Sequence, residues 1–191
     1  MRRAGLVLAA MMMCAGCDAA PPHVAAQRFG FGRPATAAEI RALDIGIMPD
    51  GTGLPAGSAT AADGAPVYAA KCVACHGASG EGTPVAPRLV GRIPHDAFPF
   101  AQSLALQDTK TIGNYWPYAT TIFDYVRRAM PQNHPGSLTD HEVYALTAWL
   151  LWKNDIVKAD AVIDARTLPA VQMPARHRFV RDDREASTRV R

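Results

Sequence analysis

Two cysteines and a histidine stand close together in the first half of the chain, as Cys72-Val73-Ala74-Cys75-His76. Two thiols separated by two residues can add to the two vinyl groups of haem as thioethers, and the adjacent imidazole can then bind the iron. The spacing C-x-x-C-H therefore predicts covalent attachment of haem c through Cys72 and Cys75, with His76 as an axial ligand. The motif occurs once, so we expect a single haem.

The same residue types also occur in zinc sites and in redox-active dithiols. A zinc site would need a second pair of ligands. His134 and His141 are too far apart for the usual spacing, and the remaining cysteines, Cys14 and Cys17, lie in a leader. A thioredoxin-like pair would need a βαβ context, which the surrounding pattern does not provide. Zinc binding and dithiol chemistry are therefore less favoured than haem attachment.

A haem that carries electrons rather than binding a substrate needs a second axial ligand. Met130 is the first candidate because methionine sulfur raises the reduction potential and because this residue follows a predicted helix and precedes a proline. Enough chain separates it from the motif for the sulfur to approach from the opposite side. Met48 and Met173 also precede prolines but lie outside the span between the two main helices. The iron could instead bind His134, which would give a lower potential, or keep an open position.

The N-terminus has the layout of an export signal. Two arginines form a basic region, residues 4–15 form an apolar stretch too short to span a bilayer as a helix, and Ala15-Gly16-Cys17 resembles the end of a bacterial lipobox. We expect export to the periplasm, with a lipid on Cys17 that holds the protein to a membrane surface. The alternative is simple cleavage near Ala19 or Ala20. Export agrees with haem attachment, which takes place outside the bacterial cytoplasm.

The chain has 191 residues, which indicates one domain with extensions. We divide it into a leader (1–17), an extended arm (18–60), a haem domain (61–155) and a C-terminal tail (156–191). The end of the tail, residues 181–191, is expected to be mobile. The formal charge of +3 includes the two leader arginines, so charge gives no reason to expect binding to nucleic acid.

The arm is rich in alanine, proline and glycine but carries several large apolar residues. Residues 36–43 (TAAEIRAL) are expected to form a short helical turn. The apolar residues indicate that the arm packs on its own domain or on a partner; they are Ile40, Leu43, Ile45 and Ile47.

Two helices flank the stretch between the haem motif and Met130. The first should begin at Asp63 as N-cap, hold Pro66 in its first turn and run toward Cys75. The second should cover residues 119–128, where apolar residues recur on one face, and proline ends it directly after Met130.

A third helix should start with a capping box formed by Thr139 and Glu142 and continue to about Asn154. It is apolar almost all round, so it should be largely buried. Residues 92–117 show no regular pattern and contain an aromatic cluster. With helices as the only strong elements, the sequence predicts an all-α domain.

Together these features resemble class I cytochrome c, an all-α fold around one covalently attached haem. The resemblance rests on CVACHG, PRLVG, RRAMP and the Ala-Trp-Leu of the last helix. It implies that Gly64 and Tyr68, before the haem motif, pack against Leu146 and Trp149 of the last helix.

The same resemblance implies further residues around the haem. The carbonyl of Pro87 is expected to accept a hydrogen bond from the His76 ring and so to fix this ligand. Leu89, in the same PRLVG stretch, is expected to contact the haem. Tyr115 and Trp116 are expected to reach the haem propionates, with core packing as the alternative.

A more specific resemblance covers about residues 38–155 and includes the arm. The stretches IMPDGTGLPAGSATAADGAPVYAAKCVACHG, GNYWPYATTIFDYVRRAMP and PGSLTDHEVYALTAWLLWKND are similar to the cytochrome subunits of bacterial sulfite and sulfane dehydrogenases (SoxD type). This implies a molybdopterin subunit as partner, which oxidises the sulfur compound and passes electrons to this chain, and a downstream cytochrome or oxidase that receives them. No substrate chemistry is expected in this chain alone. A general periplasmic shuttle to a terminal oxidase is the alternative, and Met130 disfavours a haem sensor or peroxidase.

Overall fold

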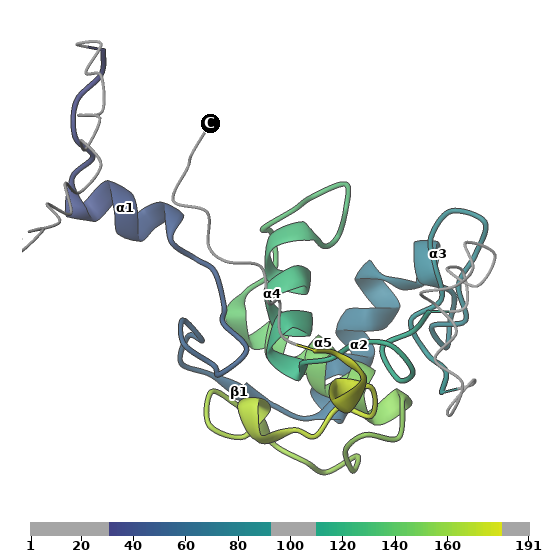
Figure 1. Cartoon of the computed structure of the whole chain (residues 1–191). Coiled ribbons are helices and arrows are strands. Elements are labelled where there is room, and N and C mark those ends of the chain that lie inside the picture. The colour runs from purple at the N-terminus through teal and green to yellow at the C-terminus, as the bar shows by residue number, and fades with distance from the viewer. Residues whose placement is uncertain (1–30, 93–109, 181–191) are drawn as a thin grey trace, which may run out of the picture.

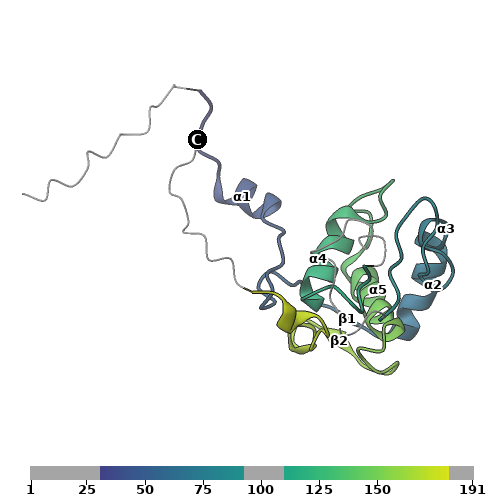
Figure 2. The same cartoon turned by 45° about the vertical axis from the view of Figure 1, so that its right-hand side comes forward.

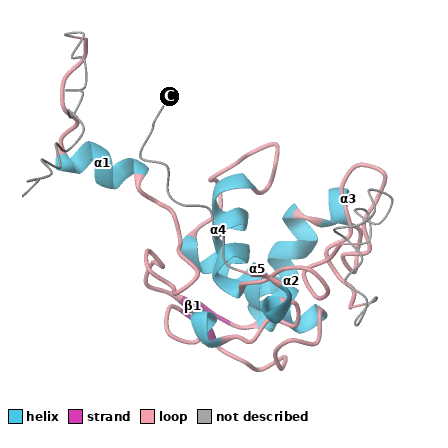
Figure 3. Ribbon diagram, viewed as in Figure 1, coloured by secondary structure: helices cyan, strands magenta, loops and turns pink. Residues whose placement is uncertain are grey.

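The computed structural model describes residues 31–92 and 110–180. In these ranges the regular structure is helical apart from two strands of two residues each (Figures 1 and 3). The all-α class is therefore confirmed. The elements are α1 (Ala37–Leu43), β1 (Ser58–Ala59), α2 (Ala61–Lys71), α3 (Val73–His76), α4 (Ala119–Ala129), α5 (Asp140–Lys153), β2 (Ile163–Asp164), η3 (Leu168–Ala170) and η4 (Arg176–Arg178).

Helix α5 forms the centre of the core. The nine residues from Val143 to Leu151 are all buried, as its all-round apolar sequence predicts. Both α2 and α4 pack against it. None of the helices in the described part of the chain is long and apolar enough to cross a membrane.

A glycine allows α2 to approach α5 closely. A Cβ atom at Gly64 would lie 2.1 Å from the carbonyl oxygen of Ala145 and 2.6 Å from the Cβ of Trp149. One turn later, the Tyr68 ring stacks on the Trp149 ring, with centroids 3.8 Å apart and planes 20° apart. Leu146 is buried in the same core. The packing of Gly64 and Tyr68 against the last helix is therefore confirmed.

The start of α2 differs from the prediction. Thr60, not Asp63, is the N-cap, and Asp63 lies at the third helical position. Its carboxylate accepts hydrogen bonds from the Thr60 N–H and hydroxyl, both at 2.8 Å. Pro66 consequently lies in the second turn. The prediction was wrong because a capping box uses two residue types that can each serve as the cap, and only the three-dimensional structure shows which one does.

The boundaries of α1, α4 and α5 agree with the sequence. Thr36 is the N-cap of α1, and α4 ends with Met130 as its C-cap. In α5 the Glu142 carboxylate accepts the Thr139 N–H at 2.9 Å, and the Glu142 N–H donates to the Thr139 hydroxyl at 3.2 Å. Asn154 is the C-cap of this helix. These ends were predictable because short-range capping determines them.

The described part of the segment after α5 packs on the domain. Strand β2 pairs antiparallel with β1 at the end of the arm, and Ile163, Leu168 and Met173 are buried in the core. Residues 156–180 therefore contribute to the domain. The leader with Cys17, residues 93–109 and the end of the tail at 181–191 lie outside the described residues.

Only one of the four apolar arm residues packs on the domain. Ile47 is 5% exposed, and its N–H donates to the buried carboxylate of Asp124 at 3.0 Å. Ile40, Leu43 and Ile45 are 55%, 84% and 41% exposed. Helix α1 buries no residue and stands away from the other helices in both views (Figures 1 and 2).

We predict that Gly64→Ala destabilises the protein by about 3 kcal/mol, because the new methyl group would collide with a backbone carbonyl that cannot move independently of α5. Denaturant unfolding followed by circular dichroism measures this. Ala65→Gly is the matched control, since Ala65 is an exposed neighbour in α2 and its loss should cost about 1 kcal/mol. Equal stability of Gly64→Ala and the parent protein would contradict the close approach.

Candidate haem site

The two cysteines of the motif lie at a break between two helices. Cys72 ends α2, donating its N–H to the Tyr68 carbonyl at 2.9 Å. Its own carbonyl accepts the N–H groups of Cys75 and His76 at 3.2 and 2.9 Å, which starts α3. The helix predicted to run toward Cys75 therefore ends at Lys71, and the motif forms its own turn, α3; φ at Cys72, between the two helices, is −121°. Cys72 is partly buried and Cys75 is exposed.

The loop after α3 contacts the side chain of His76, the last residue of the motif. The Nδ1 atom of His76 lies 2.9 Å from the carbonyl oxygen of Pro87. A carbonyl can only accept, so Nδ1 carries the proton and Nε2 keeps a lone pair that can bind iron. The hydrogen bond implied by the family resemblance is thus present. The loop is also fixed to α3 by the Gly82 N–H, which donates to the His76 carbonyl at 2.8 Å.

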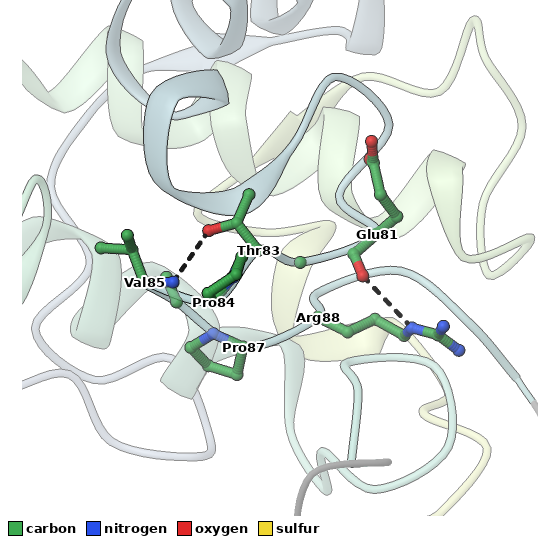
Figure 4. A pocket seen from close by; sticks show the side chains of 8 residues that line it. Glu81, Thr83, Pro84, Val85, Pro87 and Arg88 are labelled. Carbon is green, nitrogen blue, oxygen red and sulfur yellow. Dashed lines mark hydrogen bonds between the residues drawn. The ribbon is translucent and has the colours of Figure 1, made fainter.

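The same loop closes on itself, as Figure 4 shows. The Val85 N–H donates to the Thr83 hydroxyl at 3.1 Å, and Arg88 Nε donates to the Glu81 carbonyl at 3.4 Å. These residues border a hollow of about 640 Å³ that is lined by residues 81–88 alone. Neither cysteine nor Met130 lines this hollow, so it is a feature of the loop and not the crevice for the macrocycle.

The end of α5 positions the segment that contains Leu89. The side-chain amide of Asn154, 1% exposed, donates to the Leu89 carbonyl at 3.3 Å, and its oxygen accepts the Gly91 N–H at 2.9 Å. Leu89 itself is partly buried against the core. Sequence reasoning placed Asn154 near the helix end but missed this role, since the partners lie far away along the chain.

Arg92 is a second residue that the sequence did not single out. Its Nε is buried and has no hydrogen-bond partner among the described residues, while Nη1 donates to the Asp155 carbonyl at 3.3 Å. A buried N–H group of a guanidinium is costly without an acceptor. It is therefore suited to an anionic group of a bound cofactor, such as a haem propionate.

Met130 lies at the end of α4, at the edge of the core. It is partly buried and packs on the core, and its N–H donates to the Val126 carbonyl at 3.2 Å. The loop it opens is held at its base by the ion pair between Arg127 Nε and Asp140 Oδ1, 3.0 Å apart. Leu138, just before α5, is buried.

The rival ligands are placed less favourably. Met48 is 55% exposed on the arm, and Met173 is 4% exposed within the core. His134 is exposed in the loop after Met130. Of the three methionines in the described ranges, Met130 alone is both partly covered and adjacent to the core. The assignment of Met130 as the sixth ligand remains a prediction that this arrangement supports.

The two aromatic residues before α4 have protein partners. The Trp116 indole N–H donates to the Thr121 hydroxyl at 2.8 Å, and the ring packs edge-on to Tyr125. The Tyr115 ring packs edge-on to Phe179, with centroids 5.5 Å apart. Both aromatic rings therefore pack against protein groups. The contact of Tyr115 and Trp116 with haem propionates stays a prediction.

Taken together, the residues of the site fit haem. Cys72, Leu89, Trp116 and Met130 are all partly buried along the edge of the core, so a planar apolar ring could complete their burial. In Figure 1, α3 and the loop after α4 lie at the same upper side of the domain. The Pro87 contact orients His76, and the buried Arg92 Nε–H has no acceptor among the described residues.

Zinc is the alternative use of these residue types. Burial raises the pKa of the Cys72 thiol to about 11, so the free thiol is protonated at neutral pH. No group of three His, Cys, Asp or Glu side chains gathers as a metal site within the described ranges.

Comparisons with known proteins agree with this site. The family model for subunit III of cbb3-type cytochrome c oxidase matches residues 59–150. Among solved structures, a chain of the sulfane dehydrogenase SoxCD from Paracoccus pantotrophus is similar, with 37% identity and a TM-score of 0.70 over 84% of this chain and 76% of that chain. A search of curated proteins gave no match. The chain therefore belongs to the cytochrome c family, with an all-α cytochrome c fold and covalently bound haem c, and it resembles the SoxD-type subunit of sulfur-compound dehydrogenases.

Proposed function

We propose that this protein is the exported electron-transfer subunit of a molybdenum-dependent sulfite or sulfane-sulfur dehydrogenase. The observation that carries the proposal is the 37% identity, over 84% of the chain, with a chain of sulfane dehydrogenase SoxCD. That similarity extends well beyond residues 59–150, which the general haem-domain model matches. It therefore supports a relationship to the dehydrogenase subunit in particular, in addition to membership of the cytochrome c family.

In this proposal the sulfur compound is oxidised on a separate molybdopterin subunit. Haem supplies one-electron transfer between ferric and ferrous iron when bound. Cys72 and Cys75 would hold the ring, and His76, oriented by Pro87, and Met130 would bind the iron. The protein would then leave no position on the iron for a substrate, and the Met130 sulfur would keep the reduction potential high. A two-electron oxidation then requires two successive transfers to this subunit.

The proposal includes export to the periplasm and attachment to a membrane surface. Its support is the order of two arginines, an apolar stretch and Ala15-Gly16-Cys17 at the N-terminus. A diacylglyceryl group on Cys17 would carry more than one acyl chain, which gives stable anchoring where a single chain gives only marginal binding. A downstream cytochrome or oxidase would then receive the electrons at that surface.

The second candidate is a general shuttle that delivers electrons to a terminal oxidase. The match of residues 59–150 to the model of an oxidase cytochrome subunit favours it. A shuttle would normally be small and freely diffusing, and the arm and the lipid signal argue against that role.

The axial ligand can be tested by substitution. We predict that Met130→Ala lowers the reduction potential by on the order of a hundred millivolts, because the soft sulfur ligand is lost, and that the ferrous protein then binds carbon monoxide. Spectroelectrochemistry and carbon monoxide difference spectra measure these changes. Met48→Ala, on the exposed arm, is the control and should change neither property. An unchanged potential in Met130→Ala would refute the ligand assignment.

The dehydrogenase role can be tested on the native protein. We predict that the cytochrome isolated from sulfur-grown membranes retains molybdenum and that sulfite or a sulfane-sulfur compound reduces its haem bands. Molybdenum analysis and visible spectroscopy on the same fraction provide the measurement. Haem without molybdenum, reduced only by respiratory donors, would instead establish the shuttle.

A further inference from the structure

We infer that the part of the arm formed by residues 31–48 binds the catalytic molybdenum subunit through an apolar face that contains Ile40 and Leu43, continued by Ile45. The inference rests on the proposed function and names the surface through which the two subunits associate.

Exposed apolar side chains are concentrated on the arm. Every residue from 31 to 46 is exposed. The described residues include ten exposed large hydrophobic side chains, and five of them lie in this short segment. Such a concentration marks a surface that another molecule covers. The five are Phe31, Ile40, Leu43, Ile45 and Met48.

The start of helix α1 is specified by its own sequence, although none of its residues is buried by the described part of the domain. Thr36 and Glu39 form a complete capping box, and Arg33 donates to the Glu39 carboxylate through both terminal nitrogens. The guanidinium is the main reason that the pKa of Glu39 falls to about 2. A helix of seven residues is nevertheless too short to be stable alone in water. A partner that covers the helix would stabilise it. Because the capping box already favours the helical start, binding would cost less conformational entropy.

The arm leaves the domain from a fixed point on α4. The Ile47 N–H donates to Asp124, which also accepts Arg128 Nε at 3.0 Å. The Thr120 hydroxyl donates to the Pro49 carbonyl at 3.2 Å. Residues 47–49 are thus attached along the helix that leads into Met130. A partner bound to the arm is consequently held near the haem domain.

The charge and size of this segment favour a larger protein as its partner over a membrane surface or a second copy of the chain. Its two arginines, Arg33 and Arg41, are balanced by Glu39 and Asp44, so the segment lacks the positive cluster that anionic lipid surfaces attract. Pairing of the seven-residue α1 with a second copy of itself would bury far less than the roughly 1,200 Å² of a stable interface. A larger protein surface could cover the whole of residues 31–48 and so bury all five exposed apolar side chains.

The structural match points to the dehydrogenase partner in particular. It covers 84% of 191 residues, which is about 160 residues. Only 148 residues run from Asp44 to the end of the chain, so the match necessarily includes part of the chain before Asp44. The similarity to the chain of sulfane dehydrogenase SoxCD therefore extends beyond the haem domain toward the arm.

The test compares two faces of α1 in the full-length haem protein. Ile40 and Leu43 are three residues apart and share one face, whereas Ala38 and Ala42 lie on the opposite face. The variant Ile40→Asp/Leu43→Asp should raise the Kd for the isolated molybdenum subunit at least tenfold and leave the haem spectrum and midpoint potential unchanged. The matched control Ala38→Asp/Ala42→Asp adds the same charges and should bind within about twofold of the parent protein. Calorimetric titration measures both.

The outcomes separate this inference from the proposed function. If the parent protein does not bind the molybdenum subunit, the dehydrogenase role itself fails. If the parent protein binds and the Ile40→Asp/Leu43→Asp variant binds equally well, the arm is not the docking surface. Loss of self-association in sedimentation, or loss of binding to lipid vesicles, without a change in subunit affinity would also overturn the inference, because a second copy or a membrane would then be the partner.

Discussion

The close approach of α2 and α5 at Gly64 is the contact on which the haem site depends. Helix α2 leads directly into Cys72. The short distance between α2 and α5 at Gly64 therefore determines where the motif starts. The Tyr68 hydroxyl donates to the Gly77 carbonyl at 2.9 Å. Tyr68, which stacks on Trp149 of α5, therefore also fixes the position of the residue that follows the motif. At its other end, α5 holds the Leu89 segment through Asn154. One helix therefore positions both the attachment residues and the segment beside them.

The opposite side of the site depends on α4 and the loop that it begins. If Met130 is the sixth ligand, its uncharged thioether is attracted to the iron only weakly over distance, so the loop that carries it would have to be restricted. The Arg127–Asp140 pair is partly exposed and such pairs contribute at most about 1 kcal/mol. The buried Leu138 and the packing of α4 on α5 must therefore supply most of the restraint. Through Asp124, the same helix also anchors the arm, which links the docking segment to the element that carries Met130.

Sequence patterns predicted what short-range chemistry determines. The C-x-x-C-H motif, the Thr139 capping box and the proline after Met130 each act within a few residues. The break at Cys72 and the role of Asn154 were not predictable because they depend on tertiary contacts. The packing of residues 156–180 was missed for the same reason: β1 and β2 have two residues each, too few for a period of two to be visible, and their pairing joins distant parts of the chain.

The arm shows how a structure can separate residues that look equivalent in sequence. Ile47 is buried on α4, whereas Ile40 and Leu43 remain in water. If the catalytic subunit binds the arm, affinity and electron transfer are carried by different surfaces. A tethered partner experiences a high effective concentration of the haem domain, so the direct contact between the two redox centres need not be strong. The surface around the haem motif then stays free to release electrons to the next carrier between transfers.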